Sequence, residues 1–111
     1  MSEVAMITYE EFRKVELKIA TIKEVKPHPN ADKLYVVTVD INGIARQLVA
    51  GIRLFYAEDV LIGKQVVVVE NLAPAVIRGV ESQGMILAAS DESGISVVSP
   101  DRHVQDGSLV K

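Results

Sequence analysis

The sequence predicts an all-β protein with a short helix near its N-terminal end. Residues 34–41 are mostly β-branched or aromatic and precede Asn42-Gly43, the strongest short-range signal for a β-hairpin. Residues 65–70 contain four consecutive valines, which indicate a strand buried on both faces. Residues 15–22 alternate apolar with charged side chains, as a half-buried strand does. Three strands and one hairpin are therefore expected from these stretches.

The size and composition predict one globular domain. The chain has 111 residues, 49% of them hydrophobic and 24% charged, which suits a single domain over residues 1–111 with a barrel core at about 15–99. The absence of cysteine excludes disulfides and thiolate metal sites and is typical of a reducing compartment. The sequence contains neither a secretory signal pattern nor a membrane-spanning apolar run, so we expect a cytoplasmic protein.

The charge balance limits the classes of ligand. The formal net charge of -3 argues against a highly basic nucleic-acid binder, so any contact with a polyanion has to be local. His28 and His103 are far apart and lack the spacing of metal ligands, and we expect both to be solvated loop residues. We therefore expect no metal site and no cofactor.

The N-terminal residues predict a helix followed by a bent strand. Thr8 and Glu11 have the spacing of a capping box, which predicts a helix from Tyr9 to about Val15. Tyr9 and Phe12 share one face of this helix, where they either close over the core or form a sticky surface. In the strand that follows, the apolar positions slip by one residue after Ile19, as a β-bulge would cause.

A restricted loop follows this strand at residues 26–33. It contains two prolines and the turn-forming residues Asn30 and Asp32, and it presents Lys33 at its far end. The loop is either a plain solvated turn or a rigid support that holds a charge ready for a ligand.

The remaining elements follow from local patterns. We expect a strand at 44–50, a short irregular helix within 52–61 ended by Gly63, a proline loop, a strand at 81–90, a turn at 91–94, a strand at 95–99 and an irregular tail from 100 to 111 with apolar Leu109 and Val110.

The stretch from Glu81 to Ser90 is unusual for a strand. It is made of small, nearly uncharged residues and contains Gly84, and glycine within a strand marks a bulge or the close approach of a backbone or ligand. A core strand and a binding surface both fit this pattern.

This order of elements fits the OB-fold, a five-stranded barrel, here with a short N-terminal helix and a C-terminal extension. The fit rests on five or six strands, a hairpin between the second and third strands, and a helical turn between the third and fourth. A β-sandwich or an SH3-like barrel would also satisfy the strand count. OB-folds bind oligonucleotides on strands two and three and through two loops, those joining strands one to two and four to five.

Four motifs in order connect the chain with a known family: Asp32-Lys33-Leu34, Val49-Ala50-Gly51-Ile52, Asn71-Leu72-Ala73-Pro74 and residues 81–90, Glu-Ser-Gln-Gly-Met-Ile-Leu-Ala-Ala-Ser. With these motifs the chain resembles the free-standing tRNA-binding proteins and the C-terminal appendix of many methionyl-tRNA synthetases. The resemblance covers essentially all 111 residues. It implies an OB-fold that recognises tRNA by shape near its corner, and a homodimer built through the N- and C-terminal additions. It also implies methionyl-tRNA synthetase as a partner, and neither DNA nor a membrane.

The resemblance implies six site residues: Lys33, Asn71, Arg78, Ser82, Gln83 and Met85. Cations such as Lys33 and Arg78 can bind phosphate, and amides and hydroxyls suit 2′-hydroxyls or base edges. Met85 offers a polarizable surface to a base, although simple core filling is the commoner role of a methionine. Arg46 and Arg53 are second-ranked candidates for extending the positive path. Where relatives often have basic residues after the proline, this chain has Ala75 and Val76, which predicts a weaker grip on phosphate.

Other functions remain open at this point. An enzyme is not expected, because the serines lack a suitably spaced histidine and no nucleotide-binding glycine loop is present. The alternative to tRNA binding is an OB-fold chaperone of the export type that binds unfolded peptide, or a purely structural dimerisation module.

Overall fold

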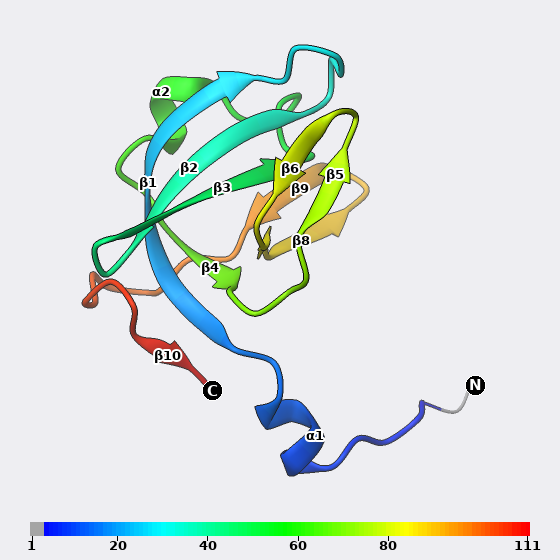
Figure 1. Cartoon of the computed structure of the whole chain (residues 1–111), viewed down its shortest axis with the longest axis vertical. Helices are drawn as coiled ribbons and strands as arrows, with labels where there is room; N and C mark the ends of the chain where they lie inside the picture. Colours follow the sequence, from blue (N-terminus) through cyan, green and yellow to red (C-terminus); the bar gives the residue numbers. More distant parts are fainter. Residues whose placement is uncertain (1–3) are drawn as a thin grey trace.

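The computed structural model describes residues 4–111, which form a curled antiparallel sheet with two small hairpins against it (Figure 1). The five barrel strands follow the order β3-β2-β1-β4-β7, and β10 pairs with β1. The elements are α1 (Tyr9–Arg13), β1 (Leu17–Pro27), β2 (Tyr35–Ile41), β3 (Ile44–Ala50), α2 (Glu58–Leu61), β4 (Gln65–Val69), β5 (Ala75–Ile77), β6 (Val80–Ser82), β7 (Met85–Ile86), β8 (Ala88–Asp91), β9 (Gly94–Val97) and β10 (Leu109–Val110). The predicted all-β OB-like fold is confirmed.

The hairpin of β2 and β3 forms where the sequence predicts it. Asn42 and Gly43 have φ of 53° and 89°, the two positive values that a type I′ turn requires. Ile41 and Ile44 are therefore register partners, and alternate side chains of β2, beginning with Tyr35, are buried in the barrel.

Strand β1 is long and bent, as the sequence predicts. Its register with β2 shifts between Ile22 and Glu24, slightly later than the slip in the apolar pattern. The bend lets one strand pair with β2, β4 and β10. The strand extends to Pro27 and so includes the first residues of the predicted loop.

Strand β4 is buried along its whole length, and this confirms the interpretation of the four valines. Val66 and Val68 are fully buried in the core cluster. Gln65 binds the C-terminal segment, because its Nε2 donates to the Val104 carbonyl at 2.7 Å and its Oε1 accepts from the Val104 amide at 3.1 Å. The tail that was predicted to be irregular is therefore anchored to the barrel, and its end forms β10.

The capping box of α1 is confirmed, although the helix ends at Arg13 rather than near Val15. Thr8 Oγ1 accepts from the Glu11 amide at 3.1 Å, and Glu11 Oε1 accepts from the Thr8 amide at 3.0 Å. The helix stands away from the barrel and buries none of its residues (Figure 1). Tyr9 is 67% exposed, so this face does not close over the core.

The region from residue 71 to 97 differs most from the prediction. The proline loop contains the hairpin of β5 and β6, with Arg78 at φ 53° and Gly79 at φ 90° in its turn. Arginine is uncommon at positive φ, which explains why no hairpin is predicted there from local turn signals. The single strand predicted over residues 81–90 is wrong, because this stretch is divided among β6, β7 and β8.

Among residues 4–111, no helix is long and apolar enough to cross a membrane. The same residues include no group of three potential His, Asp or Glu ligands arranged to hold a metal ion.

Candidate functional site

His28 joins the loop between β1 and β2 to the hairpin of β5 and β6. Its side chain is 3% exposed, so the expectation of a solvated histidine is wrong. Nδ1 accepts from the Asn30 amide at 2.9 Å, and therefore Nε2 carries the proton and donates to the Ile77 carbonyl at 2.9 Å. No β-ladder joins the loop between β1 and β2 to the hairpin of β5 and β6, so the imidazole provides hydrogen bonds between them in place of backbone pairing. It thereby fixes the loop that presents Lys33.

Arg78 and Arg53 add further links to the same loop. Arg78 Nη2 donates to the Asn30 carbonyl at 3.0 Å, and Asn30 Nδ2 donates back to the Arg78 carbonyl at 3.2 Å. Arg53 Nη1 donates to the Ala31 carbonyl at 3.2 Å. These bonds place two guanidinium groups on the loop that carries Lys33.

The result is a positively charged groove of about 430 Å³, here called the cation groove, lined by Ala31, Asp32, Lys33, Leu34 and Arg78. Within residues 4–111 the salt bridges are Lys18–Glu70 and Lys26–Glu24, and neither involves Lys33, Arg53 or Arg78. The three cations keep their charge available for an anion, although the Asp32 carboxylate lowers the local potential.

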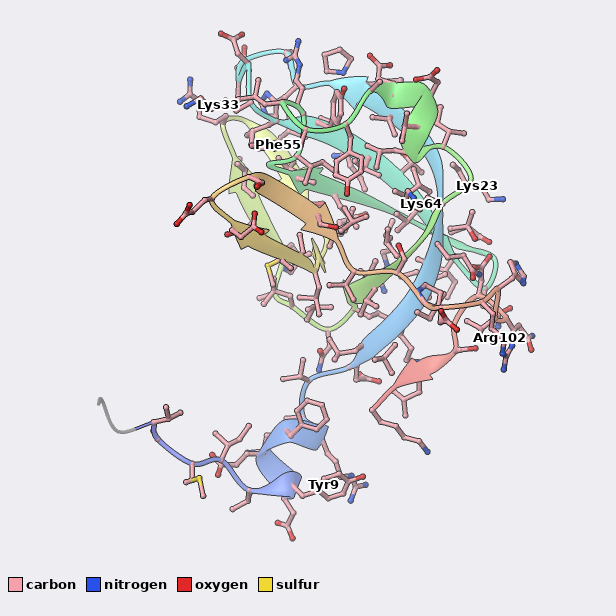
Figure 2. All side chains as sticks on the ribbon, turned by 180° about the vertical axis from the view of Figure 1, so that it is seen from behind. Tyr9, Lys23, Lys33, Phe55, Lys64 and Arg102 are labelled. Atoms are coloured by element: carbon pink, nitrogen blue, oxygen red, sulfur yellow. The ribbon has the colours of Figure 1, made fainter. Side chains whose placement is uncertain are left out.

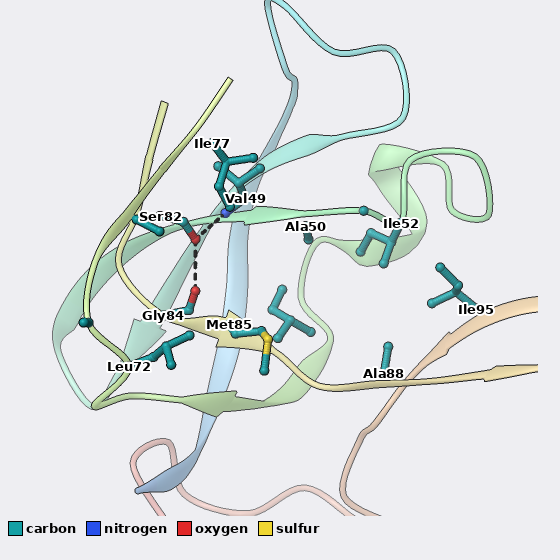
Figure 3. Close-up of a pocket in the computed structure, with 14 residues that line it drawn as sticks. Val49, Ala50, Ile52, Leu72, Ile77, Ser82, Gly84, Met85, Ala88 and Ile95 are labelled. Atoms are coloured by element: carbon teal, nitrogen blue, oxygen red, sulfur yellow. Dashed lines mark hydrogen bonds between the residues drawn. The ribbon is translucent and has the colours of Figure 1, made fainter. Parts of the chain in front are cut away.

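A second cavity of about 370 Å³ adjoins the two hairpins and is here called the apolar pocket (Figure 3). Three of the sequence motifs converge on it, from β3, the proline loop and the stretch 81–90. Its lining is mostly aliphatic: Val49, Ala50, Gly51, Ile52, Leu72, Ala73, Ala75, Ile77, Ser82, Gly84, Met85, Ile86, Ala88 and Ile95. Met85 is 43% exposed, which fits a surface role better than core filling.

Ser82 holds one wall of the apolar pocket in place. Its side chain is 3% exposed, and Oγ accepts from the Val49 amide at 3.0 Å and donates to the Gly84 carbonyl at 2.9 Å (Figure 3). Both functions of the hydroxyl are used inside the protein. Direct contact of Ser82 with a ligand, expected from the sequence, does not fit this burial.

Gly84 is required next to Ser82 for steric reasons. Its φ is 145°, and a Cβ atom there would lie 2.7 Å from the Val69 carbonyl oxygen. The close approach of β4 to this segment explains the glycine in the strand pattern. This internal contact accounts for the glycine without the close approach of a ligand.

Gln83 and Arg46 brace the seam where β3 meets this segment. Gln83 Oε1 accepts from the Gln47 amide at 2.9 Å, and its own amide donates to the Gln47 carbonyl at 2.8 Å. Arg46 Nη1 lies 3.4 Å from the Gln83 carbonyl and 3.3 Å from the Glu70 carbonyl. These two predicted site residues are thus used for internal contacts.

Asn71 has a different set of partners. Its Oδ1 accepts from the Glu16 amide at 2.8 Å, and its Nδ2 donates to the Lys14 carbonyl at 2.5 Å. The side chain therefore joins the proline loop to the segment between α1 and β1, and it lines neither the cation groove nor the apolar pocket.

The structure thus brings Lys33, Arg53 and Arg78 together, places Met85 at a separate but adjoining cavity, and assigns internal contacts to Arg46, Asn71, Ser82 and Gln83. Lys33 lies on the opposite side of the barrel from Lys23 and Arg102 (Figure 2). Sequence reasoning missed His28 and the aliphatic wall of the apolar pocket. The sequence signal for this aliphatic wall was the clustering of small and branched residues in the motifs at 49–52, 71–74 and 81–90.

Comparisons with known proteins identify the family and the fold of the chain. Residues 17–109 match the family described as "Putative tRNA binding domain". The chain is 50% identical over 105 residues to the methionine–tRNA ligase of Pyrococcus furiosus, an alignment that covers 95% of this chain and 14% of that protein. The chain therefore spans about a seventh of the length of this relative.

Two solved structures have closely similar folds. The MetRS-related protein from Pyrococcus horikoshii superposes with a TM-score of 0.90 at 30% identity, covering 97% of this chain and 100% of the other. The chaperone CsaA from Picrophilus torridus superposes with a TM-score of 0.89 at 29% identity, covering 96% and 100%.

Proposed function

The chain belongs to the tRNA-binding domain family and is homologous to the C-terminal region of archaeal methionine–tRNA ligases, and from that premise we propose that it binds folded tRNA near the corner of the molecule. The observation that carries the proposal is the cation groove. An acidic chain with a net charge of -3 places Lys33 and Arg78 in one groove and bonds Arg53 to the backbone of the same loop, and none of the three has an ion-pair partner among residues 4–111.

In this proposal the residues have two kinds of role. Lys33, Arg53 and Arg78 bind backbone phosphates, and Met85 offers an exposed apolar contact beside them. Ser82, Gln83, Asn71 and Arg46 act as positioning residues, because their side chains already bond within the protein. Recognition then depends on the shape of the RNA more than on its sequence.

A gel-shift comparison tests this function. The purified protein is expected to retain folded tRNA and to release single-stranded RNA of equal length under the same salt conditions. The logarithm of the affinity is expected to fall against the logarithm of salt concentration with a slope of roughly 2 to 4, since few phosphates are contacted. Equal retention of both RNAs, or a slope near zero, would contradict the proposal.

We further propose that the protein assists methionyl-tRNA synthetase, in trans or as its β subunit. The supporting observation is the sequence similarity to a segment of that enzyme. Addition of the protein to a methionyl-tRNA synthetase that lacks such a segment is expected to lower the KM for tRNA. An unchanged KM at saturating protein would contradict this part of the proposal.

The same protein is proposed to be a homodimer, joined through α1 and β10. A groove between these elements is lined in part by Tyr9, Phe12, Leu109 and Val110, and Tyr9 and Leu109 are 67% and 55% exposed. A two-fold dimer would cover this surface on both copies. Light scattering is expected to report a dimer for the natural protein and a monomer for Leu109→Ser, while Leu54→Ser, at a similarly exposed site elsewhere, stays dimeric.

Peptide binding of the chaperone type is the second candidate. The observation that favours it is the aliphatic lining of the apolar pocket, which suits the apolar side chains of an unfolded peptide. A dansylated unfolded peptide that binds in the pocket, combined with failure to retain tRNA, would replace the first proposal by this one.

A further inference from the structure

We propose that the apolar pocket receives one unstacked base of the bound tRNA while the cation groove binds the phosphate next to it. This inference rests on the proposed tRNA binding and names the part of the RNA that each cavity accepts. It assigns the site to a single extruded nucleotide, and hence to RNA with a distorted or looped backbone.

The two cavities adjoin in two places. Ile77 lines the apolar pocket, and the next residue, Arg78, lines the cation groove. Gly51 lines the pocket, and a Cβ atom there would lie 3.7 Å from Leu34 Cδ2, a side chain that lines the groove. An apolar cavity next to a groove that carries Lys33 and Arg78 complements a nucleotide, whose base has two apolar faces and whose ribose carries an anionic phosphate.

The walls of the pocket determine what it can read. None of its lining residues carries a charge, and both hydrogen-bonding functions of Ser82 Oγ are occupied by Val49 and Gly84. Burial of a base in the pocket is therefore favoured by the apolar area that is removed from water. The pocket offers no side-chain group that distinguishes one base edge from another. It accepts different bases with similar affinity.

The same geometry explains selection for folded tRNA. Bases within a helix are stacked and paired, so they cannot enter an aliphatic cavity, whereas bases extruded from loops can. Unfolded RNA also has accessible bases, but placing one base and one phosphate at the two cavities together carries an ordering cost. A folded corner with a pre-extruded base avoids that cost.

A methyl-labelled protein provides the direct test. Protein labelled with ¹³C at the methionine methyl groups is titrated with a folded tRNA transcript. The Met85 methyl resonance is expected to move upfield, because it lies against the ring current of the inserted base, while Met6, at 93% exposure on the N-terminal segment, stays in place. The spectrum of Met85→Leu assigns the resonance.

A pair of pocket variants provides the thermodynamic test. Ala88 lines the apolar pocket, whereas its neighbour Ala89 lies outside it, and both are exposed. Ala88→Leu fills the pocket and is expected to weaken tRNA binding about tenfold without a change in the salt slope. Ala89→Leu adds the same volume next to it and is expected to leave the affinity unchanged.

The outcomes separate this inference from the proposed function. Full tRNA affinity of Ala88→Leu together with an unmoved Met85 methyl would overturn base insertion and leave tRNA binding in place. Failure of the natural protein to retain folded tRNA in the gel-shift comparison would overturn the proposed function itself. Binding of an apolar decapeptide that shifts the Met85 methyl resonance, when tRNA alone does not move it, would overturn base insertion and assign the apolar pocket to peptide.

Discussion

The barrel and the two-hairpin end of this molecule are held together by different means. Strands β1 to β4 form continuous ladders with an interior of valine, isoleucine and leucine, and hydrogen bonds there come from the backbone. The end that carries the cation groove and the apolar pocket is joined to the barrel by a few backbone hydrogen bonds and by single side chains, among them His28 and Ser82. Loss of one such side chain removes one of these few links, so we expect this end to be the more sensitive to conservative substitution.

The largest effect is expected at Gly84. Gly84→Ala places a Cβ atom 2.7 Å from the Val69 carbonyl oxygen at a φ of 145°, so steric overlap adds to the backbone cost and the free energy of unfolding is expected to fall by about 2 to 5 kcal/mol. Urea denaturation of the natural protein and of the variant measures this change in the free energy of unfolding.

Gly43→Ala is the control for this variant. Gly43 also has a positive φ, but nothing lies within 4 Å of the position that a Cβ atom would take, so only the backbone cost of about 1 to 2 kcal/mol is expected. Equal losses in the two variants would show that the approach of β4 to Gly84 is not close enough to matter.

Ser82→Ala is expected to have the next largest effect. The substitution leaves the buried Val49 amide without its partner, and an unsatisfied buried donor costs about 1 to 3 kcal/mol. Thermal denaturation is expected to show a lower midpoint, with weaker tRNA binding as a consequence. Ser90→Ala on the exposed strand β8 should leave the midpoint in place. If Ser82→Ala is as stable as the natural protein but binds tRNA poorly, the result would instead support direct contact between Ser82 and the RNA.

His28→Ala tests the link between the loop and the hairpin. It removes both imidazole hydrogen bonds, but Asn30 is exposed and water can replace one of them, so a loss of about 1 to 2 kcal/mol is expected. Hydrogen exchange should accelerate in the loop 28–34 and in β5, while β1 to β4 stay protected. His103→Ala, at an exposed position, serves as the control, and uniform acceleration over the whole barrel would contradict the division into two regions.

The smallest effect on stability is expected for Lys33→Ala, because the side chain is exposed. Its effect on tRNA binding is larger: affinity should decrease and the salt slope should fall by about 1, as for the loss of one phosphate contact. Filter binding at several salt concentrations measures both quantities. Lys23→Ala, on the opposite side of the barrel, removes the same charge and should leave the slope unchanged (Figure 2).

The sequence predicted the parts of the fold that local signals determine. The capping box of Thr8 and Glu11, the turn at Asn42-Gly43 and the buried strand β4 each depend on residues within a few positions of one another. Tertiary context did not need to be known for any of them.

The site was harder to predict because its contacts are distant in sequence. His28 meets Ile77 across 49 positions, and Ser82 meets Val49 across 33. Polar residues of this kind resemble surface residues in the sequence, and only the fold reveals that their hydrogen-bonding groups are already used. Lys33 and Arg78 were named in advance through the family resemblance, and the structure shows both exposed in one groove.

The positions of α1 and β10 have a consequence for how this domain can be attached to other proteins. Both lie at the end of the barrel opposite the loop between β1 and β2 (Figure 1). A fused polypeptide would thus be joined to the domain through elements that lie away from the loop that carries Lys33. Attachment at that end would leave the cation groove and the apolar pocket exposed, and a ligand bound there would be kept at a raised local concentration near a fused partner.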